Sequence, residues 1–161
     1  MSNQQTLVAG IGNIFLGDDA FGVEVTRHLV QHELPDNVRV VDFGIRSFDL
    51  AYAILEDYKA TILVDATQRG HPPGTVYLIE PDLSDLEALE GEMIEGHSMN
   101  PVKVLAMVKQ LGGQPKQLYL VGCEPAVLET EDGYIGLSEP VEGAIDEAIT
   151  MIKSLIEKIN H

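Results

Sequence analysis

The sequence predicts one α/β domain, in which a mostly parallel, twisted five-stranded sheet carries helices on both of its faces. Short apolar runs rich in β-branched residues alternate along the chain with segments whose apolar residues recur at helical spacing. This alternation is typical of a parallel sheet covered by helices. The 161 residues suit a single core, and no repeat, low-complexity tract or linker divides them. We therefore expect residues 1–161 to form one domain.

The N-terminal segment predicts a strand, a glycine-rich turn and a helix. Residues 7–11 are an apolar run that suits a buried strand. The run breaks at Gly10, Gly12 and Asn13, which tolerate backbone conformations that other residues resist. Helical spacing follows over about residues 20–31, and Asp18 is a plausible N-terminal cap for this helix.

Two further strands end at aspartates. Residues 38–43 and 60–64 are apolar and β-branched enough for strands, and they lead into Asp42 and Asp65. Between them, Ser47 is a candidate cap for a short helix.

The second half of the chain predicts two strands and two helices. The strands are residues 75–79 and 118–123, and one helix begins at Asn100-Pro101. A last helix follows Ser138 and carries an apolar stripe to its end. Residues 80–95 contain seven carboxylates and no Lys or Arg, so we expect this segment to be solvated and partly mobile.

Composition excludes several classes of function. The formal net charge of −16 would repel a phosphate polyanion, so we expect no nucleic-acid partner. The single cysteine, Cys123, excludes an intrachain disulfide and a thiolate zinc knuckle. No apolar run approaches the roughly 20 residues that span a bilayer, and the first residues lack the features of a signal peptide. We expect a cytoplasmic protein with no membrane partner.

Four candidate site residues lie at or after predicted strand ends. Asp19 follows the first strand, Asp42 and Asp65 end the second and third, and His97 lies in the connection after the fourth. In open parallel sheets, ligands bind beyond the carboxyl ends of the strands, so this topology would bring these distant residues together. Two carboxylates and one imidazole can hold a divalent transition metal and leave positions open. Asp19, Asp65 and His97 therefore predict a metal site of modest affinity.

Each of these residues also has a simpler interpretation. An aspartate at a helix start is most often a cap, which would account for Asp19. An aspartate at a strand end, such as Asp65, commonly bonds a nearby turn. His97 could be a surface or loop-packing residue, so the spacing alone leaves the metal site open.

Several segments resemble the nickel–iron hydrogenase maturation endopeptidases. The most specific is residues 10–22, which read Gly-Ile-Gly-Asn-Ile-Phe-Leu-Gly-Asp-Asp-Ala-Phe-Gly. Four later segments agree with the family in order and spacing: Val41-Asp42-Phe43-Gly44, Leu63-Val64-Asp65-Ala66, Gly96-His97-Ser98 and Leu120-Val121-Gly122-Cys123-Glu124-Pro125. The resemblance covers nearly the whole chain.

The resemblance implies a specific activity. Members of this family remove a short C-terminal extension from the hydrogenase large-subunit precursor after nickel has been inserted. The family's metal-contacting positions fall on Asp19, Asp65 and His97, and an acidic position implicated in substrate recognition falls on Asp42. The nickel is carried by the precursor, so no tightly bound resting cofactor is expected. Residues 42–47 read Asp-Phe-Gly-Ile-Arg-Ser and depart from the Asp-Gly-Gly-Thr form of some relatives.

Three competing interpretations remain at this point. Cys123 could be a nucleophile with His97 as its base, although its apolar neighbours favour a small buried residue. A dinucleotide-binding enzyme would need a third glycine sooner after Gly10 and Gly12 than Gly17 provides. A non-enzymatic nickel carrier or assembly chaperone would use the same three ligands without cutting a peptide.

Overall fold

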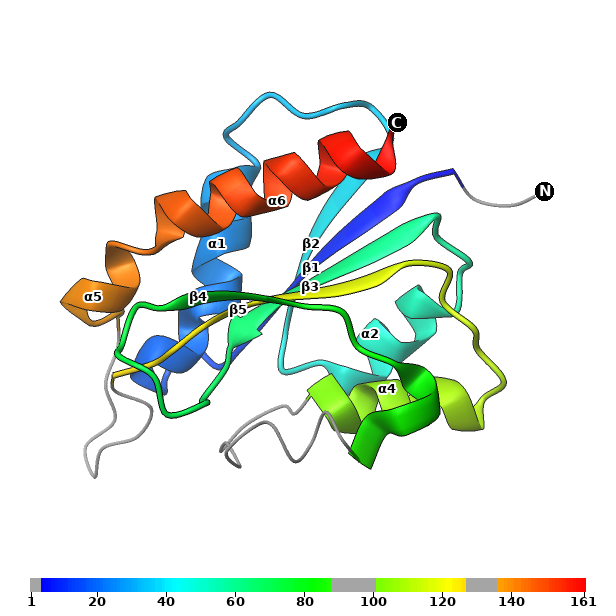
Figure 1. Cartoon of the computed structure of the whole chain (residues 1–161), viewed down its shortest axis with the longest axis horizontal. Helices are drawn as coiled ribbons and strands as arrows, with labels where there is room; N and C mark the ends of the chain where they lie inside the picture. The colour runs from blue at the N-terminus through cyan, green and yellow to red at the C-terminus, as the bar shows by residue number, and fades with distance from the viewer. Residues whose placement is uncertain (1–3, 88–100, 127–135) are drawn as a thin grey trace.

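A computed structural model describes residues 4–87, 101–126 and 136–161. Five strands form one sheet in the order β2-β1-β3-β5-β4 (Figure 1). The strands are β1 (Thr6–Ile11), β2 (Val38–Gly44), β3 (Ala60–Ala66), β4 (Val76–Ile79) and β5 (Leu118–Cys123). All neighbouring pairs are parallel except β4 with β5, which is antiparallel. The predicted five-stranded, mostly parallel sheet is confirmed.

Helices cover both faces of the sheet, as predicted (Figure 1). The helices are α1 (Phe21–Leu29), α2 (Ser47–Ile54), α4 (Pro101–Gln110), α5 (Glu139–Glu142) and α6 (Ile145–Ile159). One core lies between the sheet and the α1 and α6 side, and a second core lies between the sheet and α2 and α4. The central strands β1, β3 and β5 are mostly apolar because both of their faces are buried.

Three predicted helix starts differ from the structure. Ser47 is the first residue of α2 and not its cap, because Arg46 occupies the N-cap position. The first helix is preceded by a 3-10 turn, η1 (Gly17–Ala20), and no side chain caps α1, so the prediction that Asp18 caps this helix is wrong. The last helical segment begins with the short α5, which stops before α6 begins. Ser138 precedes α5 but makes no side-chain capping bond, because its hydroxyl donates to Asp18 instead.

Close packing fixes the start of α1 against the sheet. A side chain at Gly22 would collide with the backbone carbonyl oxygens of Val64 in β3 and Ile11 in β1. Only a glycine lets the helix approach this closely. The turn before α1, which carries Asp19, is therefore held directly over the carboxyl ends of these two strands.

The chain connections lead to opposite edges of the sheet from β1 and from β3. From β1 the chain passes through α1 to β2, and from β2 it passes through α2, on the other face, to β3 on the far side of β1. Connections that leave neighbouring strands in opposite directions open a crevice at the strands' carboxyl ends, where α/β proteins bind ligands. From β3 the chain continues to β4 and β5 on the side away from β2, so this position lies between the ends of β1 and β3, and we refer to it as the crevice.

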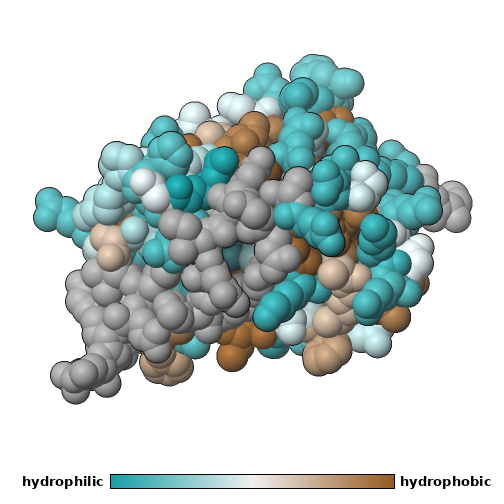
Figure 2. All heavy atoms as spheres, turned by 60° about the horizontal axis from the view of Figure 1, so that its bottom comes forward, coloured by the Kyte–Doolittle hydropathy of each residue, from teal (hydrophilic) through white to brown (hydrophobic). Residues whose placement is uncertain are grey.

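The surface is mainly hydrophilic on the face that Figure 2 brings forward, with hydrophobic side chains in separate patches. This agrees with the large excess of acidic residues. Among the described residues, no helix combines the length and the apolar character needed to cross a membrane.

Candidate active site

Asp65 lies at the crevice because β3 runs two residues past its pairing with β1. Val64 pairs with Gly10 of β1, whereas Asp65 pairs with Gly122 of β5 on the other side. Its side chain is 4% exposed, and its carboxylate oxygen Oδ1 accepts a hydrogen bond from the Ala66 N–H at 2.8 Å. Asp65 is thus a carboxylate fixed at the end of a central strand.

Asp19 reaches the same crevice from η1. Its side chain is 8% exposed, and its oxygen Oδ2 accepts a hydrogen bond from the Asn13 N–H at 2.9 Å. The carbonyl oxygen of Leu16 accepts from the Asp19 N–H, which closes the turn. The loop after β1 therefore folds back on itself and holds the Asp19 carboxylate below the surface.

The two carboxylates are close enough to affect each other's charge. Burial raises the pKa of Asp65 well above its ordinary value, and the negative charge of Asp19 raises it further. Two buried carboxylates that repel each other favour a shared cation or proton. The crevice therefore has the electrostatics of a cation site, supplied by residues 46 positions apart in the sequence.

Asp42 lies at the same edge of the sheet but in a different environment. It pairs with Gly10 across the β1–β2 ladder, so it is on the opposite side of β1 from Asp65. Its side chain is exposed, and its backbone carbonyl oxygen accepts a hydrogen bond from Arg46 Nη2 at 2.5 Å. Asp42 is thus placed to contact a molecule that lies across the end of the sheet.

The third predicted ligand, His97, lies outside the described residues, as does the second half of the acidic segment over residues 80–95. Within residues 4–87, 101–126 and 136–161, no group of three or more His, Cys, Asp or Glu side chains is arranged to hold a metal ion. The structure thus brings together Asp19 and Asp65, two of the three predicted ligands.

Asp18 and Asp19 are adjacent but have different environments. Asp18 is fully buried and accepts hydrogen bonds from the Ala126 N–H at 2.7 Å, the Ser138 N–H at 2.7 Å and the Ser138 hydroxyl at 2.8 Å. It connects the turn before α1 to two segments more than a hundred residues away. Asp18 therefore fastens the turn that carries Asp19.

Glu124 is a buried carboxylate to which the sequence analysis assigned no role. Its oxygen Oε1 accepts from the Tyr77 hydroxyl at 2.6 Å, the Arg69 N–H at 2.9 Å and the His71 N–H at 3.1 Å. These bonds hold the loop between β3 and β4 against the end of β5. A glutamate directly after a buried apolar strand was the available signal, because a carboxylate in that position needs several donors.

Cys123 has the properties of a packing residue. It is fully buried, and burial together with the nearby carboxylates of Asp18 and Glu124 raises the pKa of its thiol to about 12. A thiol with that pKa stays protonated near neutral pH and is a poor nucleophile. The structure therefore supports the interpretation of Cys123 as a buried core residue.

We expect Cys123→Ala to retain the peptidase activity that the resemblance implies to within about twofold, because the thiolate is the reactive form and is not populated at this position. The check is the initial rate of precursor cleavage, with a thermal melt to confirm folding. Iodoacetamide should also fail to label the folded wild-type protein at about pH 7.5, where the thiol is protonated. A folded Cys123→Ala protein that has lost its activity would restore the nucleophile interpretation.

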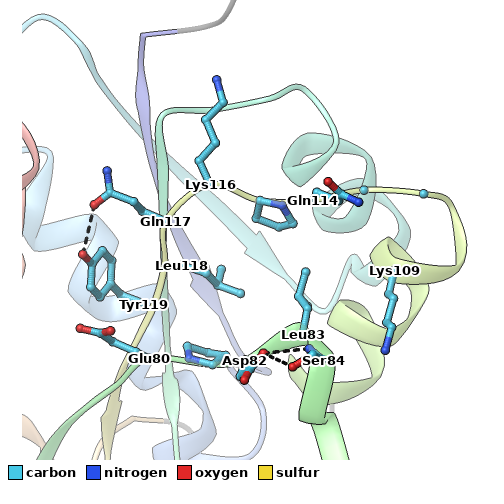
Figure 3. A pocket seen from close by; sticks show the side chains of 14 residues that line it. Glu80, Asp82, Leu83, Ser84, Lys109, Gln114, Lys116, Gln117, Leu118 and Tyr119 are labelled. Carbon is cyan, nitrogen blue, oxygen red and sulfur yellow. Dashed lines mark hydrogen bonds between the residues drawn. The ribbon is translucent and has the colours of Figure 1, made fainter.

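A hollow with a volume of about 770 Å³ lies at the end of the sheet opposite to Asp65 (Figure 3). Its walls come from the end of β4, the start of β5 and the segment after α4. Asp82 there accepts from the N–H and hydroxyl of Ser84, while Lys109 and Lys116 point in different directions. This hollow is remote from Asp65, which lies at the other end of β3 and β5, so we do not include it in the site.

Known proteins with similar sequences define the class of enzyme. The family model for hydrogenase maturation proteases matches residues 23–155. The hydrogenase 2 maturation protease of Escherichia coli K12 is 32% identical over 154 residues, covering 94% of this chain and 90% of that protein. The hydrogenase expression/formation protein HupD of Rhodobacter capsulatus is 35% identical over 148 residues, covering 91% of this chain and 68% of that protein.

The fold leads to the same class. The solved structure of the hydrogenase maturating endopeptidase HybD from E. coli matches with a TM-score of 0.81 and 31% identity, covering 96% of this chain and 93% of that one. The protein is therefore a hydrolase of the endopeptidase type. It belongs to the hydrogenase maturation protease family, as the motifs indicated.

Proposed function

We propose that this enzyme removes the C-terminal extension of a nickel–iron hydrogenase large-subunit precursor once nickel has been inserted, and that it recognises the nickel directly. The observation that supports this proposal is the pairing of Asp19 and Asp65 in the crevice at the sheet's carboxyl edge. Burial, and after it the negative charge of Asp19, raises the pKa of Asp65, so an incoming divalent cation would relieve an existing electrostatic cost. The family to which the chain belongs fits the same activity.

In this mechanism Asp19, Asp65 and His97 contact the nickel ion that the precursor carries. Because the ion belongs to the substrate, the enzyme needs only modest affinity for the free metal, which agrees with a site that has no thiolate ligand. The contacts align the extension with the enzyme, and alignment of this kind can account for a large part of a rate enhancement. Asp42 binds the peptide beside the metal from its exposed position at the end of β2.

The direct test compares nickel-loaded and nickel-free precursor. We expect purified enzyme to shorten only the nickel-loaded precursor, and intact-mass measurement before and after incubation shows the loss of the extension. A heat-inactivated enzyme sample is the control. Equal cleavage of both forms would contradict nickel recognition, and transfer of nickel without a change in precursor mass would indicate a carrier.

A further inference from the structure

Several of the exposed large apolar side chains in the described residues lie just after β1 and β2. Ile14 (45% exposed) and Phe15 (62%) follow β1, Ile45 (58%) follows β2, and Phe48 (66%) lies in the first turn of α2. The other strongly exposed large apolar residues among those described are Tyr52 of α2 and, in separate parts of the structure, Val30, Leu78 and Leu111. Exposed apolar residues that gather at one place usually mark a binding surface.

Three of these side chains line one groove. Ile14 and Phe15 contribute to it from the loop after β1, and Ile45 contributes from the segment after β2, together with Asp42 and Phe43 of β2. The groove has a volume of about 370 Å³, which suits a few side chains rather than a whole domain. We call it the β1–β2 groove.

Hydrogen bonds hold both segments that line the β1–β2 groove in place. The Asn13 side chain accepts from the Phe15 N–H at 2.9 Å, and the Asn13 carbonyl accepts from the Leu16 N–H at 3.1 Å, so Ile14 and Phe15 sit on a closed turn. After β2, Arg46 donates to the carbonyl oxygens of Asp42 and Phe43. Because these turns are already ordered, a ligand loses less free energy in fixing them.

The β1–β2 groove adjoins the proposed active site at Asn13. Asn13, which lines the groove, also donates its N–H to the Asp19 carboxylate. A peptide that is cut beside Asp19 and Asp65 must leave the crevice along one side, and this groove offers apolar contacts directly next to it. Arg46 already donates hydrogen bonds to the carbonyl oxygens at the end of β2. A peptide in the groove would therefore be recognised through its side chains and not by pairing with β2 as an added strand.

We propose that the β1–β2 groove binds apolar side chains of the precursor's C-terminal extension and so contributes to the choice of substrate. This inference rests on the proposed function and adds a specificity surface to it. The chemistry of the groove selects an extended segment whose apolar side chains enter between Phe15 and Ile45. The body of the large subunit remains outside this contact.

The test uses the double variant Phe15→Ala/Ile45→Ala and equilibrium binding to nickel-free precursor. This form carries the extension but is not cut under the proposed function, so binding can be measured without turnover. We expect the dissociation constant to rise about tenfold or more, as is common when central apolar contacts are truncated. With nickel-loaded precursor, KM should rise and kcat should change little.

The matched control is Val30→Ala/Leu111→Ala. Both residues are more than half exposed, and Val30 lies at the far end of α1 from the groove. This control should bind and cleave the precursor as the wild type does. Melting curves of both double variants should match the wild type, since all four side chains are largely exposed.

The processed large subunit, which lacks the extension, identifies what occupies the β1–β2 groove. Its binding should be the same for the wild type and Phe15→Ala/Ile45→Ala. Unchanged binding of the precursor would overturn the proposal, and so would equal weakening for precursor and processed subunit, because the body of the subunit would then be the occupant. A wild-type protein that binds through the groove but cleaves nothing would contradict the proposed function alone.

Discussion

Replacing Asp65 with asparagine is expected to abolish cleavage of the nickel-loaded precursor and to stabilise the metal-free enzyme. The amide keeps an oxygen that can accept the Ala66 N–H, so the end of β3 should retain its shape. The substitution removes a negative charge from the proposed metal contact, and lost metal contacts commonly cost several kcal/mol in a transition state. We therefore expect activity to fall by about 100-fold or more.

The stability change has a sign that depends on pH. The folded-state pKa of Asp65 is raised by burial and by Asp19, so the folded protein holds this proton more tightly than the unfolded chain does. Wild-type stability is then lost as pH rises above the unfolded pKa of about 4. The substituted amide cannot ionise, so the advantage of Asp65→Asn should be small near about pH 4 and larger at about pH 7.5.

Melting temperatures at these two pH values, with a chelator present, measure this difference. The control is Asp49→Asn, which removes an exposed carboxylate that pairs with Arg46 at the surface and should change stability little at either pH. If Asp65→Asn cleaves the precursor at the wild-type rate, Asp65 has no role in the mechanism. If it also melts lower than the wild type at the higher pH, the electrostatic account of the crevice is wrong.

Replacing Asp18 with alanine should produce the largest loss of stability of any single substitution considered for this protein. The change leaves the backbone N–H groups of Ala126 and Ser138 and the Ser138 hydroxyl without their carboxylate partner. A hydrogen bond to a charged group contributes about 1.5–3 kcal/mol, and an unsatisfied buried donor adds its own cost. We expect the free energy of unfolding to fall by about 3–5 kcal/mol, a large part of the roughly 5–15 kcal/mol typical of a domain.

Urea denaturation of Asp18→Ala provides the measurement, and Ser138→Ala is the graded control. Ser138→Ala removes only the hydroxyl donor and should cost about 1 kcal/mol. A loss below about 1 kcal/mol for Asp18→Ala would mean that water or other donors replace these bonds, and the fastening role would have to be withdrawn.

The strands and their order of appearance could be predicted because buried strands in this fold are nearly continuous apolar runs. The five predicted runs all became strands, and the aspartates at two of their ends took positions at the sheet edge. The closeness of Asp19 and Asp65 followed from topology, since residues at the carboxyl ends of neighbouring parallel strands must be near each other. Sequence distance carried no information on this point.

The features that could not be predicted depend on long-range contacts. The residues next to Asp18 in the sequence predicted that it caps a helix. Its actual hydrogen-bond partners are 108 and 120 residues away, so the local sequence pattern could not reveal them. The hydrogen bonds of Glu124 with the N–H groups of Arg69 and His71 span 55 and 53 residues, so the spacing of apolar residues could not predict them either. Local rules favour the nearest donors, whereas the folded chain offers better ones from elsewhere.

The turn of residues 17–20 points the neighbouring carboxylates of Asp18 and Asp19 in different directions, and they have different roles. One anchors the C-terminal part of the molecule, while the next faces the crevice between β1 and β3. A deletion or insertion of a single residue in this turn would rotate both carboxylates away from their present partners and damage anchoring and recognition at once. Variation at this point in the chain should therefore occur by substitution, with the length of the turn held constant.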